Sequence, residues 1–476
     1  MAELNKGDLL TILQVISNML RFVGLSLVVP VLVSILYGEF LYASVFAVMA
    51  AGLTTVFSLI HFMVGKRNVQ FKHAVISVAL CWFFVGLVSA IPFLFAGISF
   101  VDAFFESVSG WSGTGLSMIP VPEQLPFSLN FWRGFIQWIG GFGIVILALI
   151  FYEKPETAHK LFQAEGRTES FYINVIRIAR IIIAIYLVYT AIGIVLLLAA
   201  GLSPFDAVVH TFTALATGGF STTSAGIGSF GKIAMSVTIL LMLLGGISFE
   251  SHRDLLKGHI KRFFLNPEVK LLFALILAAS AIIFLNSYLS QDSHFFNEFF
   301  YVVSAISGTG ASGEIGASAL PPLSIFVLIL LMVFGACYGS TTGAIKLWRI
   351  LIIFKVVRRE IYRALLHPKA VIPIKLGGKP VSSEAALDAL AYIALYISLL
   401  AVGSIIFMFG GYGVIESVFT VASAQGNVGL SVIAGSTWFG MNDALKILLS
   451  IHMIVGRMEI IPFLVVLKSF GIIRKV

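Results

Sequence analysis

One sixteen-residue stretch occurs four times in this chain, and it limits the folds that the chain can adopt. The copies align without gaps when each is anchored on one glycine. An Asp, Asn or Glu stands 13 positions before that glycine, a Ser or Thr stands six before it, and a Ser stands two after it. The copies are 102–117, 206–221, 297–312 and 416–431, and their anchors are Gly115, Gly219, Gly310 and Gly429.

Each copy predicts a short helix followed by an extended, glycine-rich tail. The Asp, Asn or Glu at its start can offset the free amides of a helix N-terminus. The roughly eleven residues that follow reach only about 16 Å, half of a hydrocarbon core about 30 Å thick. In a membrane such a helix ends midway, so its tail must be buried in protein or line a watery cavity.

Composition places the chain in a membrane. Of its 476 residues 59% are hydrophobic and 11% are charged, whereas a soluble domain carries roughly 25% charged residues. The 31 basic residues do not indicate a nucleic-acid partner, because they lie in short loops between apolar segments. Cys81 and Cys337 lie far apart in apolar surroundings, which suggests neither a disulfide framework nor a zinc cluster. The first apolar run, about 9–36, is too long for a cleaved signal.

The apolar segments predict an all-α polytopic membrane protein. We expect an N-terminal two-helix hairpin over 1–66 and then four tandem units of helix, re-entrant pore loop and helix around a central pseudo-fourfold pore. The units are 67–155, 168–262, 266–366 and 380–476. Their first helices are predicted near 70–99, 171–201, 268–290 and 384–410, and their second helices near 130–152, 232–258, 322–364 and 440–470.

Charge predicts the orientation. Of the Lys and Arg residues, only Arg133, Lys232 and Lys446 fall on the side of the half-helices. The others gather at the opposite ends, which the positive-inside rule makes cytoplasmic. The half-helices would then enter from outside, both termini would lie inside, and the chain would cross the membrane ten times.

Four tails around one axis would supply four strands of backbone carbonyls. Such carbonyls can replace the hydration shell of K⁺ without a charge that holds the ion too tightly. Glycine permits positive φ and close approach of the backbone to the ion. The alternative is that small residues merely allow close helix packing. The backbones expected to bind K⁺ are those of Ser112, Gly113, Thr114, Gly115, Ala216, Thr217, Gly218, Gly219, Ser307, Gly308, Thr309, Gly310, Gly426, Asn427, Val428 and Gly429.

Further motifs accompany the glycine tails: GGFGI at 140–144, GSTTGAIK at 339–346 and GRME at 456–459. Together they resemble the Trk/Ktr/HKT superfamily of K⁺ transporters, and the extra hairpin makes the TrkH/TrkG branch most similar. The similarity covers nearly the whole chain. It implies K⁺ uptake across the plasma membrane of a bacterium or archaeon, with K⁺ as transported ion and no covalently bound cofactor.

The same resemblance implies partners. It implies a homodimer with one pore per subunit, set in membrane lipid. It also implies cytoplasmic TrkA-like RCK subunits that bind NAD(H), ATP or ADP. We find no Rossmann segment in this sequence, so we expect nucleotide regulation to come from such a partner.

The second helix of the third unit is interrupted by Gly, Ser and Thr at 335–346. The resemblance implies that this segment is an intramembrane loop that gates conduction; the alternative is a packing kink. Glycine gives such a loop hinge freedom, and its hydroxyls can bond the freed backbone. The residues expected at the gate are Gly335, Gly339, Ser340, Thr341, Thr342, Gly343, Lys346 and Arg457.

Arg457 lies within the last apolar helix, where a charge costs roughly 2.5–3.5 kcal/mol on insertion scales. We expect it below the filter as an electrostatic barrier to ions; the alternative is a structural pair with Glu459 or another carboxylate. Lys346 either plays a similar part or anchors at the interface. Gln425 and Asn427 are expected to brace the fourth tail.

Other functions stay open. A transporter of the same fold could pass Na⁺ or couple K⁺ to Na⁺ or H⁺. In plant members of the superfamily a Ser in the first tail is linked to Na⁺ passage, so Gly115 favours K⁺ here. A membrane enzyme would need convergent acid, His or Ser–Lys constellations within the membrane. None is seen: His210, His252 and His452 have no partner at metal-ligand spacing. A structural scaffold would not need four re-entrant tails.

The four tails differ in sequence: SGTG, ATGG, SGTG and GNVG. A filter with fewer layers of equivalent oxygens should discriminate less sharply between K⁺ and Na⁺ than one of four identical strands. Flux selectivity measured beside a fully symmetric K⁺ channel tests this expectation, and equal selectivity would count against it.

Overall fold

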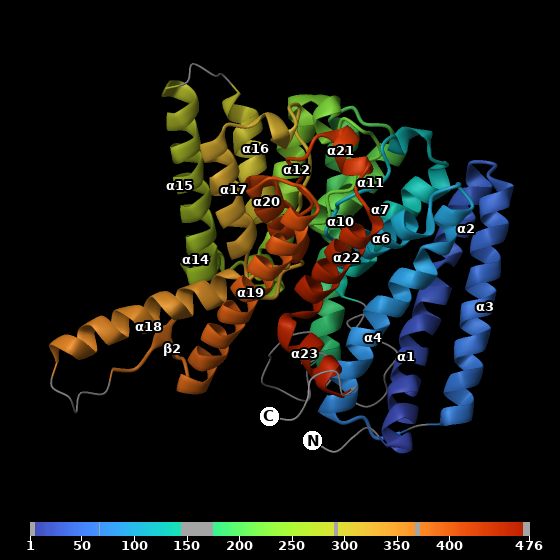
Figure 1. Ribbon diagram of the computed structural model, residues 1–476, viewed down its shortest axis with the longest axis horizontal. Helices are drawn as coiled ribbons and strands as arrows, with labels where there is room; N and C mark the ends of the chain where they lie inside the picture. The colour runs from blue at the N-terminus through green and yellow to red at the C-terminus, as the bar shows by residue number, and fades with distance from the viewer. Residues whose placement is uncertain (1–4, 66, 144–174, 290–293, 367–371, 470–476) are drawn as a thin grey trace.

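The computed structural model describes residues 5–65, 67–143, 175–289, 294–366 and 372–469. The described chain is a bundle of helices with one two-stranded hairpin, Lys375–Leu376 (β1) with Lys379–Pro380 (β2) (Figure 1). The predicted all-α membrane fold is confirmed. The end of the second helix of the first unit, beyond residue 143, and most of the basic stretch 154–180 lie outside the described residues.

The N-terminal hairpin consists of α1 (Lys6–Ser26), α2 (Val28–Leu36) and α3 (Phe40–Val64). Asn5 and Asp8 form a capping box that starts α1. A side chain at Gly24 would clash with Thr54, so glycine lets α1 and α3 approach closely.

Each unit contains a long first helix, a half-helix and a second helix. The first unit has α4 (Phe71–Ser89), α5 (Ile91–Leu94), α6 (Phe100–Ser112) and α7 (Phe127–Phe142). The second has α10 (Val175–Ala199), α11 (Pro204–Leu215), α12 (Gly231–Gly246), α13 (Phe249–Leu256) and α14 (Ile260–Leu265). The third has α15 (Pro267–Leu289), α16 (Phe295–Ile306), α17 (Pro322–Phe334) and α18 (Leu347–Leu365). The fourth has α19 (Ser383–Phe409), α20 (Val414–Gln425), α21 (Gly435–Phe439), α22 (Asp443–Met458) and α23 (Ile460–Ser469).

The half-helices are α6, α11, α16 and α20, which lie in the upper half of Figure 1. The repeated Asp, Asn or Glu is the third residue of each half-helix rather than its cap. Ser99 and Ser203 are the caps of α6 and α11, and each hydroxyl accepts a bond from the amide of the repeated Asp. In α20 the Glu416 carboxylate accepts a bond from Gly413 N at 3.0 Å. The repeated residue therefore lies within the first turn of each half-helix, where its side chain can offset the free backbone amides.

The units close into a ring. Each half-helix packs between the two other helices of its own unit. The second helix of each unit also packs against the half-helix of the next: α7 on α11, α12 on α16, α17 on α20 and α22 on α6. The last contact joins the end of the chain to the first unit, and Lys446 of α22 forms an ion pair of 2.5 Å with Asp102 of α6. This cyclic order is the predicted pseudo-fourfold arrangement.

Among the described residues, seven helical segments are long and apolar enough to cross a membrane, and the bent pair α22–α23 makes an eighth. α7 and α17 are shorter than a full span. Two predicted helices are broken. The one expected over 232–258 stops at Gly246 and restarts after Ser248, which caps α13. The one expected over 440–470 bends by 110° at Glu459, whose φ is +69°. The boundaries of the four units stay a prediction.

The hairpin is fixed to the first unit at both ends. At one end the Asp8 carboxylate lies 2.6 Å from His73 Nε2 and 2.8 Å from Lys72 Nζ, both at the start of α4. At the other end Glu39, between α2 and α3, accepts bonds from the amides of Phe127 and Ser128 at 2.6 and 2.9 Å. Glu39 thus caps α7 from a distant part of the chain.

Candidate functional site

The four tails share one backbone pattern. In each, the anchor glycine and the residue two positions earlier have positive φ, and the residue between them does not. The anchors have φ of 88° (Gly115), 73° (Gly219), 68° (Gly310) and 107° (Gly429). The earlier residues have φ of 68° (Gly113), 53° (Thr217), 67° (Gly308) and 53° (Asn427). Positive φ strains the backbone of a residue that has a side chain, so the surroundings must hold Thr217 and Asn427 in this conformation.

The tails meet around one axis. A Cβ on any anchor glycine would overlap a carbonyl oxygen of the next unit, at the position just before that unit's own anchor. The pairs are Gly115 with Gly218 O, Gly219 with Thr309 O, Gly310 with Val428 O, and Gly429 with Thr114 O. The contacts run from unit one to two, three, four and back to one. We call the four oxygens in these contacts the carbonyl ring.

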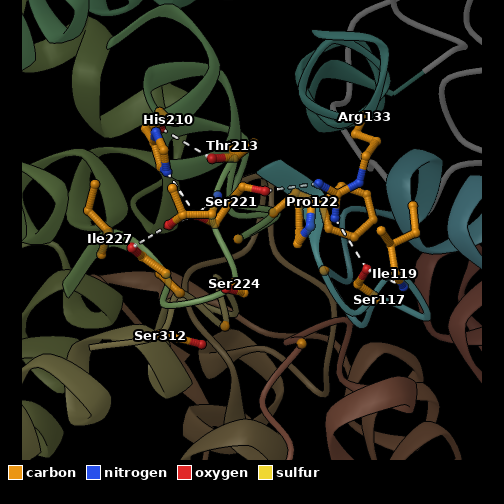
Figure 2. Close-up of a pocket in the computed structure, with 18 of the residues that line it drawn as sticks. Ser117, Ile119, Pro122, Arg133, His210, Thr213, Ser221, Ser224, Ile227 and Ser312 are labelled. Atoms are coloured by element: carbon orange, nitrogen blue, oxygen red, sulfur yellow. Dashed lines mark hydrogen bonds between the residues drawn. The ribbon is translucent and has the colours of Figure 1, made fainter. Parts of the chain in front are cut away.

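A cavity of about 180 Å³ lies on the half-helix N-terminal side of the ring. All four anchor glycines line it, together with the serines that follow three of them, Ser117, Ser221 and Ser312 (Figure 2). Serine hydroxyls and the backbone of the four tails therefore line the same cavity.

Glu106 and Arg133 stabilise the outer ends of the first two tails. Both side chains are buried, and Arg133 Nε lies 2.7 Å from Glu106 Oε1. The carboxylate also accepts bonds from Ser117 Oγ and Met118 N, each at 3.0 Å. Arg133 donates to Ser221 O at 2.9 Å (Figure 2). The pair therefore joins the first tail to the second, a role that charge counting for topology did not reveal.

The side-chain hydrogen bonds of the tails are alike in the first and third units and different in the fourth. In the first and third, a serine hydroxyl bonds a threonine hydroxyl: Ser112 with Thr114 at 2.6 Å and Ser307 with Thr309 at 2.7 Å. Asn427 Nδ2 donates to Thr114 Oγ1 at 2.9 Å and to Met453 O at 2.8 Å, which fastens the fourth tail to the first.

Gln425, which immediately precedes the fourth tail, is also bonded to α19 and α22. Gln425 Nε2 donates to Tyr396 O at 2.8 Å, and its Oε1 lies 3.0 Å from His452 Nδ1. Both side-chain groups of Gln425 thus bond to neighbouring helices of its own unit. Ala216, Ser307 and Gly426 end their half-helices as C-caps, whereas α6 runs one residue further, to Ser112.

Three glycines of the second helices were not identified as site residues from the sequence. A Cβ on Gly140, Gly245 or Gly456 would crowd the carbonyl at the C-terminal end of the half-helix of the same unit, at Trp111, Leu215 and Gln425 respectively. They let the second helices of these three units pack closely against the start of the first, second and fourth tails. Their near-constant distance in sequence from the anchor glycines is the signal that could have revealed them.

The broken segment 335–346 lies against the other side of the tails, and its Ser340, Thr341 and Thr342 are buried. Thr341 Oγ1 lies 2.8 Å from Thr217 Oγ1 of the second tail. A Cβ on Gly308 of the third tail would touch Thr342, and one on Gly343 would overlap Asn427 of the fourth. The segment therefore contacts three tails at once.

The same segment is bonded to the end of α12. Cys337 N donates to Gly246 O at 3.1 Å, and Thr341 donates to Gly245 O through its amide at 3.3 Å and its hydroxyl at 3.1 Å. These bonds satisfy the carbonyls that the break after Gly246 leaves open. They explain why the predicted helix 232–258 stops there.

Arg457 lies beside this segment. Its guanidinium donates to the carbonyls of Thr341 and Gly140, and to Gly141 O at 3.3 Å. With Gly343 and Lys346 it lines a cavity of about 30 Å³, which has room for about two water molecules.

Glu459, the carboxylate considered as a partner for Arg457, forms an ion pair of 2.7 Å with Arg349 of α18. The Arg349 guanidinium also lies 3.8 Å from the ring centre of Tyr392. This pair joins the bend between α22 and α23 to the helix that follows the broken segment. No group of three or more His, Cys, Asp or Glu that could hold a metal ion occurs in the described ranges.

Comparison with known proteins identifies the family. A family model described as a TrkH cation transport protein matches residues 45–470. A cation transporter of Methanocaldococcus jannaschii is 34% identical over 98% of this chain and 97% of its own length. The Trk system potassium uptake protein TrkH of Escherichia coli K12 is 31% identical over 84% of this chain and 86% of its own. The crystal structure of the potassium transporter TrkH from Vibrio parahaemolyticus matches with a TM-score of 0.85 and 27% identity, covering 96% of this chain and 98% of that one.

Gly310→Ala tests the close contact at the ring. The new methyl group would overlap Val428 O at a positive φ, so we expect a loss of about 1–3 kcal/mol of stability, seen as a lower melting temperature in detergent. Gly316→Ala, a few residues away at a φ of −61°, is the control and should melt like the wild type. Equal melting temperatures of the two variants would contradict the close contact between Gly310 and Val428 O.

Proposed function

The chain belongs to the TrkH family of cation transport proteins, and from this premise we propose that it takes up potassium ions across the plasma membrane. In this proposal the ions pass through the carbonyl ring from the 180 Å³ cavity, which faces outward. Both chain termini then lie in the cytoplasm, as the distribution of Lys and Arg predicts.

The closed order of the four tails supports this proposal most directly. Four backbone carbonyls from four units lie around one axis, and an outer cavity reaches every anchor glycine. Each half-helix ends where its tail begins, so four partially negative helix ends face the same region and favour a cation there. A dehydrated monovalent ion needs neutral oxygens in this arrangement. The backbones proposed to bind K⁺ are those of the sixteen tail residues named from the sequence.

We further propose that segment 335–346 and Arg457 form the gate, in its closed state here. The segment lies against three tails, and the Arg457 guanidinium bonds both to it and to α7. A cation leaving the ring would meet this positive charge within the narrow 30 Å³ cavity. Lys346, which lines the same cavity, adds to the barrier.

Regulation is proposed to act through α18. This helix follows the gate segment directly, and its far end projects away from the other helices (Figure 1). A cytoplasmic TrkA-like subunit that moved α18 would pull on the gate and, through the Arg349–Glu459 pair, on the bend after α22. The protein is proposed to work as a homodimer with one pore in each subunit.

Uptake of K⁺ by liposomes that contain the purified protein tests the function. We expect K⁺ or Rb⁺ flux above protein-free liposomes, larger than the flux of Na⁺, and a loss of flux when Gly115, Gly219, Gly310 or Gly429 is replaced by a bulkier residue. Wild-type liposomes that are no more permeable to K⁺ than empty ones would refute K⁺ conduction.

Arg457→Ala tests the gate in the same liposomes. Removing the charge and its bonds to Thr341 and Gly140 should raise K⁺ flux several-fold, and deletion of residues 339–343 should do the same. Arg363→Ala, at an exposed position on α18, is the matched control and should leave flux unchanged. If Arg457→Ala only lowers the yield of folded protein and leaves flux per molecule unaltered, the arginine is structural.

A further inference from the structure

One carbonyl of the ring differs from the other three. Within the described part of the chain, the oxygens of Thr114, Thr309 and Val428 accept no recorded hydrogen bond. Gly218 O accepts one, from the side-chain amide of Gln137 at 2.6 Å. Gln137 belongs to α7 of the first unit, so the bond crosses from one unit to the next.

Gln137 holds the second tail at two points on either side of its anchor glycine. Besides the Nε2 bond to Gly218 O, its Oε1 accepts a bond from Phe220 N at 3.1 Å. The side chain is completely buried. A Cβ on Gly218 would overlap the Gln137 amide, so this amide occupies the place of the side chain that residue 218 lacks. The other tails carry Thr114, Thr309 and Val428 at that position.

Two other second helices have no side-chain amide at the position equivalent to Gln137. Gly140, Gly245 and Gly456 make the same contact with their own half-helices and therefore set a common register. Three residues before them stand Gln137, Met242 and Met453 respectively. A methionine is thus the residue that these units use where the first unit has glutamine.

From this geometry we propose that Gln137 is a positioning residue that raises the preference of the ring for K⁺ over Na⁺. The N–H donor of Gln137 places a partial positive charge beside one carbonyl oxygen, which opposes a bound cation there, and the hydrogen bond fixes the position of that oxygen. A weaker and less mobile set of oxygens cannot contract around the smaller, more strongly hydrated Na⁺. The inference rests on the proposed conduction of K⁺ through the ring.

Gln137→Met is the direct test, because it inserts the residue of the equivalent positions. We expect the K⁺/Na⁺ flux ratio in liposomes to fall about fivefold, the scale of one hydrogen bond. Trp138→Phe on the same helix removes a bond of 3.0 Å to Thr190, which lies in no tail, and should keep the wild-type ratio. Gln137→Asn retains an amide but is too short to reach both partners, so its ratio should fall as well.

A second measurement does not depend on flux. Bound ions stabilise the folded protein, so the wild type should melt at a higher temperature in KCl than in NaCl, and Gln137→Met should narrow this difference. A wild-type flux ratio, or an unchanged difference in melting temperature, in either folded Gln137 variant would overturn the role of Gln137. Absence of K⁺ flux in the wild type would instead overturn the proposed function, which keeps the two failures apart.

Discussion

The contact between each anchor glycine and a carbonyl of the next unit is the constraint on which the rest of the structure depends. Non-helical backbone at membrane depth must be buried in protein or line a watery cavity, and here each tail is packed against another copy of the same tail. A side chain at any of these four positions would push two units apart. Three second helices pack close to the half-helices through glycines of their own, Gly140, Gly245 and Gly456. The contacts between tails and the contacts of these helices therefore both depend on the absence of side chains.

Around this symmetric centre the four units have different side chains. Asn427 fastens the fourth tail to the first, Gln137 holds the second, and Thr341 bonds the second tail to segment 335–346. The backbone pattern is common to all tails, but the side-chain bonds are not. The first and third tails share a Ser–Thr bond. The second and fourth tails, which hold Thr217 and Asn427 at positive φ, have bonds of their own. The ring geometry and the chemical differences between its members therefore have separate origins in the sequence.

The half-helices, the tails and the break at 335–346 could be predicted because glycine and polar residues interrupt apolar sequence there in a repeated order. The bend at Glu459 could not, since a glutamate at positive φ carries no local signal, and its partner Arg349 lies on another helix. The repeated acid looked like a helix cap because the true caps, Ser99 and Ser203, lie outside the aligned copies. Glu39 and Gln137 were missed for a different reason: their partners lie about eighty or more residues away.

The register of the second helices has a consequence for how this ring of four units can be encoded. Arg457 follows Gly456, and the residues that follow Gly140 and Gly245 are Gly141 and Gly246. In a channel assembled from four identical subunits, an arginine here would appear four times around one narrow opening, and like charges so close would repel strongly. Joining the four units in one polypeptide lets the fourth unit carry an arginine while the first and second units carry glycine at the corresponding position. Four unequal units in one chain thus permit a charge that strict rotational symmetry would forbid.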